Sequence, residues 1–232
     1  MFSRLSIFRV EFTLAAGLTV AQASMLNLAS LVDRSLIQRG DNGRYRIHEL
    51  LRQFAAEKLA EIAEETAVAQ AHACYYLTFL QEQGRALKGQ HSRVALKRVQ
   101  NEIENIRQGW LWAVAHGEST LLADTVSALT DVYLLTGLYG DGATLLAETA
   151  DQIAIHAPAV KLLLDSYQAR LLFEWGHLQE AHDLAVAILQ VEANPFVTTS
   201  AHLLLGQVYL KQDDIPKLKE QAKKANNLAE TE

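Results

Sequence analysis

The chain has 232 residues, of which 50% are hydrophobic and 21% charged, a balance that predicts a folded protein with a proper core and excludes a disordered one. It has three prolines and much Ala, Leu, Glu, Gln and Lys, so we expect helix nearly throughout. The single cysteine, Cys74, cannot form an intrachain disulfide, which fits a reducing compartment. The sequence contains no apolar run of about 18 residues, so we predict no membrane span. Together with the single cysteine, this leads us to expect a cytoplasmic protein.

The net charge of −6 conceals a difference along the chain. Residues 1–60 carry 8 Lys and Arg against 5 Asp and Glu, which leaves 13 against 22 for residues 61–232. Because residues 61–232 are acidic, we expect that part of the chain to bind nucleic acid poorly in a non-specific way. The mildly basic front could contact phosphates through Arg39, Arg44, Arg46 or Arg52, although ordinary solvated arginines explain the same composition.

Residues 35–58 contain a hairpin signal that runs directly into an amphipathic helix. Asp41-Asn-Gly43 supplies residues that tolerate a positive φ, and Leu36/Ile37 and Tyr45/Ile47 flank it as short apolar strands. Apolar residues recur at helical spacing on both sides: Met25, Leu26, Leu28, Leu31, Val32 and Leu36 before the turn, and Leu50, Leu51, Phe54, Ala55, Leu59 and Ile62 after it. A hairpin between helices is typical of a winged helix, so we predict such a module over residues 1–64.

Two long helices are expected next, over residues 66–87 and 91–115, with Gly89-Gln-His91 between them. They form a predicted bridge, residues 65–116, with Trp110 and Trp112 in its core. At the other end of the front half, residues 2–8 look like the exit of a longer helix. This raises the expectation that the chain is a fragment of a longer protein.

From about residue 118 the chain repeats itself. Turns centred on Gly137, Gly176 and Asp213 follow one another at separations of 39 and 37 residues, and each joins two predicted helices. Small residues such as Ala181 and Ala185 recur in the second helices, and Leu205-Gly206-x-x-Tyr209 completes a pattern that resembles the tetratricopeptide repeat. Gly142 and Gln168-Ala169-x-x-Leu172 depart from that pattern. Residues 117–232 are therefore predicted to form about three helical pairs.

In such arrays the first helix of each pair lines a concave side that usually holds a peptide or partner helix. The alternative is that the apolar members pack between repeats and the polar ones are only solvated. The pattern places these residues on that side: Asp131, Leu134, Arg170, Phe173, Glu174, Leu203, Gln207, Leu210 and Lys211.

Four segments of the front half resemble the region that follows the nucleotide-binding domain in STAND-class ATPases of the NB-ARC type, many of whose bacterial members are regulators with tetratricopeptide sensors. The segments are Leu5-Ser-Ile-Phe-Arg9-x-x-Phe-Thr13-Leu, Leu28-Ala-Ser-Leu-Val-Asp-Arg-Ser-Leu36, Arg44-Tyr-Arg-Ile-His-Glu-Leu-Leu-Arg-Gln-Phe54 and Asn101-Glu-Ile-Glu-Asn-Ile-Arg107. The resemblance implies that His48, in Ile47-His48-Glu49 where the family has a Met-His-Asp-like triplet, touches the phosphates of bound ADP. Without the family's ATPase core, a histidine that only caps a helix remains the alternative.

No catalytic or metal motif survives inspection. His48-Glu49-x-x-Arg52 lacks the second zinc ligand, because Arg52 stands where a histidine would be needed. Gly84 and Gly89 have the spacing of a phosphate-binding loop, but Gln90 and His91 replace its Lys and Ser/Thr. We therefore expect no enzyme, no metal and no cofactor, with ATP or ADP bound only by a longer parent that contains the nucleotide-binding domain.

Together these observations predict a mainly α protein in which a winged-helix module with a short β-hairpin precedes an α-solenoid. The leading hypothesis is a non-catalytic sensor region of a STAND-type signalling or transcriptional regulator, which binds a partner protein, a peptide or a small-molecule effector through the repeats. A free-standing tetratricopeptide scaffold and a DNA-binding winged helix are the alternatives. In the family the winged helix generally serves the switch, so nucleic acid is not the expected partner.

Overall fold

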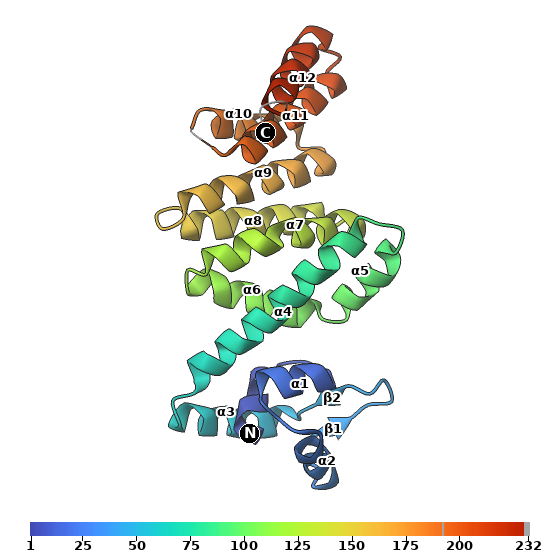
Figure 1. Ribbon diagram of the computed structural model, residues 1–232, viewed down its shortest axis with the longest axis vertical. Coiled ribbons are helices and arrows are strands. Elements are labelled where there is room, and N and C mark those ends of the chain that lie inside the picture. The colour runs from blue at the N-terminus through green and yellow to red at the C-terminus, as the bar shows by residue number, and fades with distance from the viewer. Residues whose placement is uncertain (192, 230–232) are drawn as a thin grey trace. The chain divides into compact units, whose positions relative to one another are not determined.

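The computed structural model describes residues 1–191 and 193–229, and it is mainly helical, as the composition predicted (Figure 1). The chain divides into two compact units. Unit 1 comprises Met1–Ala86 and His91–His116, and unit 2 comprises Leu87–Gln90 and Gly117–Glu232. No single helix among the described residues is long and apolar enough to cross a membrane; one pair, Leu14–Val20 and Met25–Asp33, passes that test together but is bent by 112°.

Unit 1 begins with a 3₁₀ helix, η1 (Phe2–Ile7), followed by two short α-helices, α1 (Leu14–Val20) and α2 (Met25–Asp33). Both α-helices start at side chains that satisfy free backbone N–H groups. Thr13 accepts a hydrogen bond from Ala16 N, and Ser24 forms a capping box with Asn27. These caps fix where each helix begins.

The predicted β-hairpin is present. Strands β1 (Gln38–Arg39) and β2 (Tyr45–Arg46) pair antiparallel, with Gln38 opposite Arg46 and Arg39 opposite Tyr45. Gly43 takes the expected positive φ of 75° in the turn. The strands lie partly outside the apolar positions expected to form them, because Ile37 and Ile47 flank the ladder and are buried beside it. Tyr45 also exchanges two backbone hydrogen bonds with Phe12, of 2.8 and 2.9 Å, which ties the segment after η1 to the hairpin.

Helix α3 (Glu49–Glu61) follows the hairpin. The apolar pattern predicted for α2 and α3 is there, but only part of each face is buried. Leu28 and Ala55 are fully enclosed, whereas Leu26 is 82% exposed, Leu50 69% and Phe54 53%. Helical spacing shows which residues share a face, and it does not show whether another element covers that face.

The second half of unit 1 contains α4 (Glu65–Leu87), α5 (Ser92–Gln100) and α6 (Ile103–Ala115). The single helix expected over residues 91–115 is therefore wrong, because it is broken at Asn101 and Glu102. Gly109 lies against α4, where an added Cβ would be 3.2 Å from Ala73 Cα. Trp110 is fully buried, as expected of a core residue, and Trp112 is half-buried and stacked on His116.

Unit 2 contains the three predicted helical pairs. They are α7 (Ser119–Thr136) with α8 (Tyr139–Ile153), α9 (Pro158–Trp175) with α10 (Leu178–Leu189), and α11 (Pro195–Lys211) with α12 (Ile215–Ala229). Gly137 and Gly176 end α7 and α9 in the left-handed conformation, the backbone that glycine adopts most easily. The first helices also pack on one another, α7 on α9 and α9 on α11, so the pairs are stacked.

Two helical glycines of unit 2 differ in the space around them. A Cβ on Gly142 of α8 would lie 2.7 Å from Tyr133 Cγ and 3.0 Å from Leu171 Cδ1. A Cβ on Gly206 of α11 would meet Leu218 Cδ1 at 3.4 Å, an ordinary contact. Gly142, which departs from the repeat pattern, therefore permits a close approach between helices.

Gly142→Ala should destabilise the protein by about 1–3 kcal/mol, since the new methyl group has no room in a packed core. Gly206→Ala is the matched control. It should be neutral or stabilise by up to about 1 kcal/mol, because alanine is the better helix former. Urea unfolding followed by circular dichroism measures both, and equal effects of the two substitutions would contradict the packing argument.

Candidate functional site

His48, the candidate phosphate contact, lies between β2 and α3 and is exposed. It is the N-cap of α3, where its Nδ1 accepts a hydrogen bond from Leu50 N at 3.3 Å. The remaining ring nitrogen stands at the start of the helix, near the partial positive charge of the helix dipole. Within this chain, His48 caps a helix, and the phosphate contact stays a prediction.

The first turn of α3 also contains a side-chain ion pair. Arg52 donates two hydrogen bonds to Glu49, of 2.7 and 2.8 Å, and Gln53 donates a third. These bonds, first of all those from Arg52, lower the pKa of Glu49 to about 2. Glu49 therefore remains a carboxylate beside His48 over the whole physiological range.

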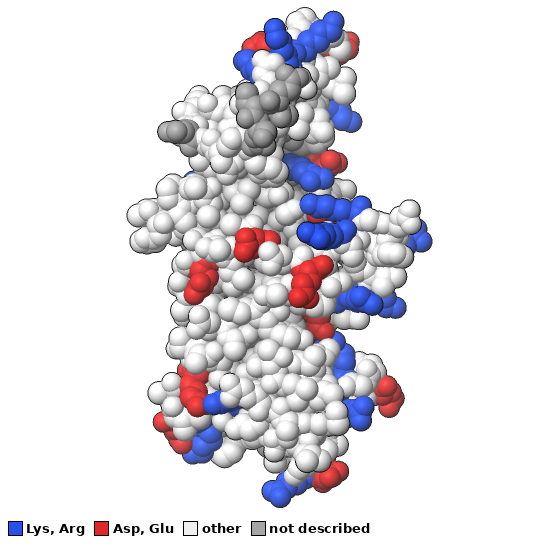
Figure 2. Space-filling view, in the orientation of Figure 1, with Lys and Arg blue, Asp and Glu red and all other residues white. Residues whose placement is uncertain are grey.

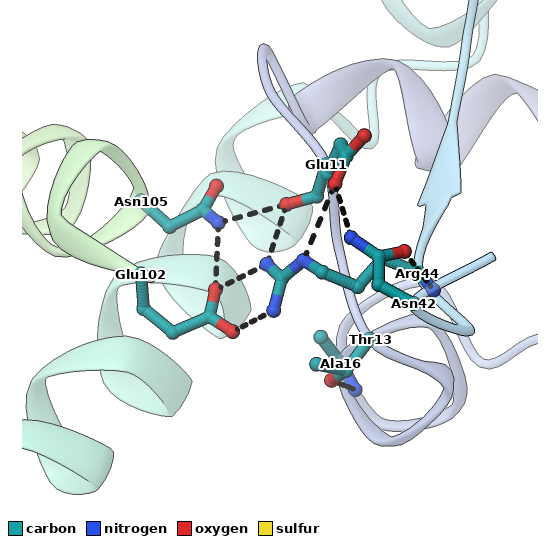
Figure 3. A network of polar contacts seen from close by, with 7 residues as sticks. All are labelled: Glu11, Thr13, Ala16, Asn42, Arg44, Glu102 and Asn105. Atoms are coloured by element: carbon teal, nitrogen blue, oxygen red, sulfur yellow. Dashed lines mark hydrogen bonds and ion pairs between the residues drawn. The ribbon is translucent and has the colours of Figure 1, made fainter. Parts of the chain in front are cut away.

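A buried polar network ties the hairpin to α6, and sequence reasoning missed it (Figure 3). The guanidinium of Arg44 donates two parallel hydrogen bonds to the carboxylate of Glu102, of 2.5 and 2.9 Å. Their side chains are only 15% and 9% exposed. Asn105 donates to Glu102 at 3.0 Å, and both Arg44 and Asn105 donate to the backbone carbonyl of Glu11. The pair raises the pKa of Arg44 mainly through the hydrogen bonds to Glu102.

This network changes the interpretation of the basic front. Of the four arginines proposed to reach phosphates, Arg44 is engaged by Glu102 and Arg52 by Glu49. Arg46 donates to Gln38, and Arg39 lies 5.9 Å from the centre of the Tyr45 ring. The two signals that could have indicated the network were Arg44 beside the turn and Glu102, the first of two acidic residues in Asn101-Glu-Ile-Glu-Asn105.

Buried polar groups of α4 lie beside this network. His72 is 1% exposed, and its ring is 4.7 Å from that of Tyr76 and 5.6 Å from that of Phe8. Burial lowers the pKa of His72 to about 4, with the facing Asn105 side chain opposing the shift and the charge of Arg9 adding to it. Burial also raises the pKa of the Tyr76 hydroxyl. Both groups are therefore neutral at pH 7.

In unit 2 the structure shows where the predicted groove residues lie. Six of the nine are exposed: Arg170, Glu174, Leu203, Gln207, Leu210 and Lys211. Leu134 and Phe173 are half-buried, and Asp131 is buried. All nine belong to the first helices of their pairs, α7, α9 and α11. Figure 2 shows that the face drawn is mostly uncharged over the repeats, with blue and red side chains interspersed.

Asp131 is not an open surface carboxylate, because Lys88 from the α4–α5 loop reaches over it. Lys88 Nζ lies 3.4 Å from Asp131 Oδ2 and donates to Ser127 Oγ at 2.9 Å. Burial raises the pKa of Asp131, and the charges of Lys88 and Arg170 oppose that rise. Lys88 itself is largely exposed, so sequence reasoning missed a cation that a loop outside the repeats places beside Asp131, one of the predicted groove residues.

Among residues 1–191 and 193–229, no three His, Cys, Asp or Glu side chains are grouped so that they could hold a metal ion. Cys74 is exposed on α4 while His72 is buried two positions earlier.

Comparison with known proteins finds mycobacterial sequence relatives. Three mycobacterial proteins, one from Mycobacterium bovis and two from strains of Mycobacterium tuberculosis, are 32% identical to this chain over 143 residues, and their names describe them as candidate HTH-type transcriptional regulators. The match includes 57% of this chain but only 16% of each relative. No family model matches the sequence.

Among solved structures, the chain is similar to a Signal Transduction ATPase with Numerous Domains (STAND) protein with a tetratricopeptide repeat sensor from Pyrococcus horikoshii. The sequences are 16% identical, and the match covers 99% of this chain and 44% of the other. The TM-score is 0.35, which is too low to support an argument about a shared fold.

Arg44→Met should destabilise unit 1 by about 3–5 kcal/mol, because it leaves Glu102 buried without its cation. Arg46→Met, two positions further on in β2 and exposed, should change stability by less than about 0.5 kcal/mol. Tryptophan fluorescence in a Trp175→Phe background reports urea unfolding of unit 1 alone, since Trp110 and Trp112 remain. Adding Glu102→Leu to Arg44→Met should recover part of the loss, and no recovery would contradict the explanation by an uncompensated charge.

Acid should destabilise unit 1 through His72. In the unfolded chain this histidine binds a proton below about pH 6.5, whereas in the folded chain it binds one only below about pH 4. The stabilisation present above pH 6.5 is therefore lost as the pH falls to 4, by up to about 3 kcal/mol. His72→Phe should make the pH dependence of unfolding shallower over that range, while Tyr76→Phe should keep the wild-type slope. Parallel slopes in His72→Phe and wild type would sink this assignment.

Proposed function

We propose that this chain is the sensor and interaction region of a STAND-type signalling or transcriptional regulator, and that a partner protein or peptide binds the first helices of the repeats. The observation that carries the proposal is the stack of three helical pairs whose first helices present six exposed residues of the predicted groove. The sequence likeness to the mycobacterial regulators supports the regulatory context. The chain spans only 16% of those relatives, so the activity of a whole protein belongs to the proposal.

The chemistry of the groove favours a peptide or protein over a nucleic acid. Arg170 and Lys211 provide charge, Gln207 provides a donor and an acceptor, and Leu203 and Leu210 are apolar and more than half exposed. An extended peptide or a helix can satisfy such a mixed surface with its own side chains. In the front half the arginines near the hairpin already contact protein groups, which weakens the DNA-binding alternative.

In this proposal the chain itself is not an enzyme, holds no metal or cofactor and acts in the cytoplasm. Its hairpin and helices serve as a winged-helix module next to the nucleotide switch of a longer parent, where His48 would approach a phosphate. The isolated chain should therefore bind ATP and ADP weakly or not at all. Tight nucleotide binding by this chain would contradict the role assigned to His48.

The test of the groove is a pull-down from a native cell extract followed by mass spectrometry. The chain with Arg170→Glu and Lys211→Glu is compared with wild type and with a matched control, Lys219→Glu and Lys223→Glu, which makes the same charge change at exposed positions of α12. A partner that wild type and control retain should fall at least tenfold with the groove variant. Circular dichroism confirms that all three proteins are folded.

Identical partners from the groove variant and from wild type would reject binding at the first helices. Loss of the same partner from both variants would show that net charge matters rather than the groove.

A further inference from the structure

Unit 1 contains a cavity of about 540 Å³, and neither His48 nor any residue of the repeats lines it. It lies between the segment after η1, the first half of α4 and the length of α6, whose Gln108 donates a 3.0 Å hydrogen bond to the carbonyl of Ile7. Its volume falls in the range of small-molecule sites.

The walls combine an apolar surface with a few polar groups, as ligand sites do. Ile7, Val10, Leu111 and the half-buried Trp112 supply apolar and aromatic surface against which a flat hydrocarbon body can pack. Ala69 is the smallest side chain of the lining and leaves room on the α4 side.

Two arginines of the lining, Arg9 and Arg107, lack the close ion pairs that some other arginines of unit 1 form. Neither Arg9 nor Arg107 forms an ion pair with any described residue, in contrast to Arg4, Arg44 and Arg52 of the same unit. Glu65 and Glu104 also line the cavity, but each lies in the first turn of its helix, where the helix dipole already complements a negative charge. Arg9 and Arg107 have no such compensation from a helix terminus.

His72 forms the buried end of the cavity. Its ring is almost completely enclosed, its Nε2 has no hydrogen-bond partner among the described residues, and it is neutral at pH 7. The nearby positive charge of Arg9 lowers the pKa of His72 further, so the charge of Arg9 acts on this end of the cavity. An anionic group placed beside Arg9 is attracted by that charge, and a cationic one is repelled.

We propose that this cavity binds a small organic anion, a carboxylate on an apolar ring body, with the carboxylate at Arg9 and Arg107 and the ring against Leu111 and Trp112. Guanidinium groups suit this task because they are always charged and can hold a carboxylate through two hydrogen bonds. The site belongs to unit 1 and shares no residue with the groove of the repeats, so it stands independently of the proposed partner binding.

The experiment uses three probes with one ring and different charge: 1-naphthoate, naphthalene-1-methanol and 1-naphthylmethylammonium. Ligand-observed NMR and isothermal titration measure their binding to the full chain. 1-Naphthoate should bind with a Kd of roughly 1 mM or tighter, as expected for a ligand of this size, and at least tenfold more tightly than the other two. Arg9→Gln should weaken it about tenfold, whereas Arg98→Gln, an equal charge change on exposed α5, should have no effect.

Filling the cavity provides the second arm. Ala69→Phe should abolish binding of 1-naphthoate, and Val10→Trp, at an exposed loop position, gives the same test if Ala69→Phe does not fold. No binding of 1-naphthoate to wild type, equal binding of the three probes, or unchanged binding after filling would each overturn the proposal. Loss with Arg9→Gln and with the filled cavity, together with retention in Arg98→Gln, would establish it.

Discussion

The Arg44–Glu102 pair is the interaction on which the arrangement of unit 1 depends. It joins residues 58 positions apart and draws in the backbone of Glu11 and the side chain of Asn105, so three segments meet at one guanidinium. A buried ion pair contributes less to net stability than its short distances suggest, because both charges lose their hydration. Its greater effect is on geometry, since a bidentate pair tolerates only one placement of the hairpin against α6.

The repeats of unit 2 depend on a different constraint, the size of side chains where helices approach one another. Gly142 admits Tyr133 and Leu171 at distances that no larger residue allows, and Ala181 and Ala185 of α10 are fully buried. Packing of this kind fixes the backbone while the outward side chains of the first helices remain free to differ. The exposed Arg170, Glu174 and Lys211 therefore do not determine the fold, and in the proposed function they select the partner.

Sequence patterns predicted the features that local rules determine. The turn at Gly43, the caps at Gly137 and Gly176 and the three helical pairs each depend on residues close together in the chain. The break at Asn101 and Glu102 and the exposure of Leu50 and Phe54 were not predicted, because they depend on distant elements. The same holds for the candidate sites: Lys88 reaches Asp131 from 43 positions away, and the cavity gathers three segments that share no motif.

Both units enclose polar groups. Unit 1 buries Glu102, Asn105 and His72 beside the half-buried Arg44, and unit 2 buries Asp131 and Asp165 on its first helices, while other charged side chains of those helices, such as Arg170 and Lys211, are exposed. A buried charge without its partner costs far more than an exposed one, so substitutions at Arg44 or Glu102 act first on folding. Substitutions at the exposed Arg170 or Lys211 leave the stack in place, so in the proposed function they alter recognition alone. That function needs both properties: buried groups that hold the geometry and an exposed surface that contacts the partner.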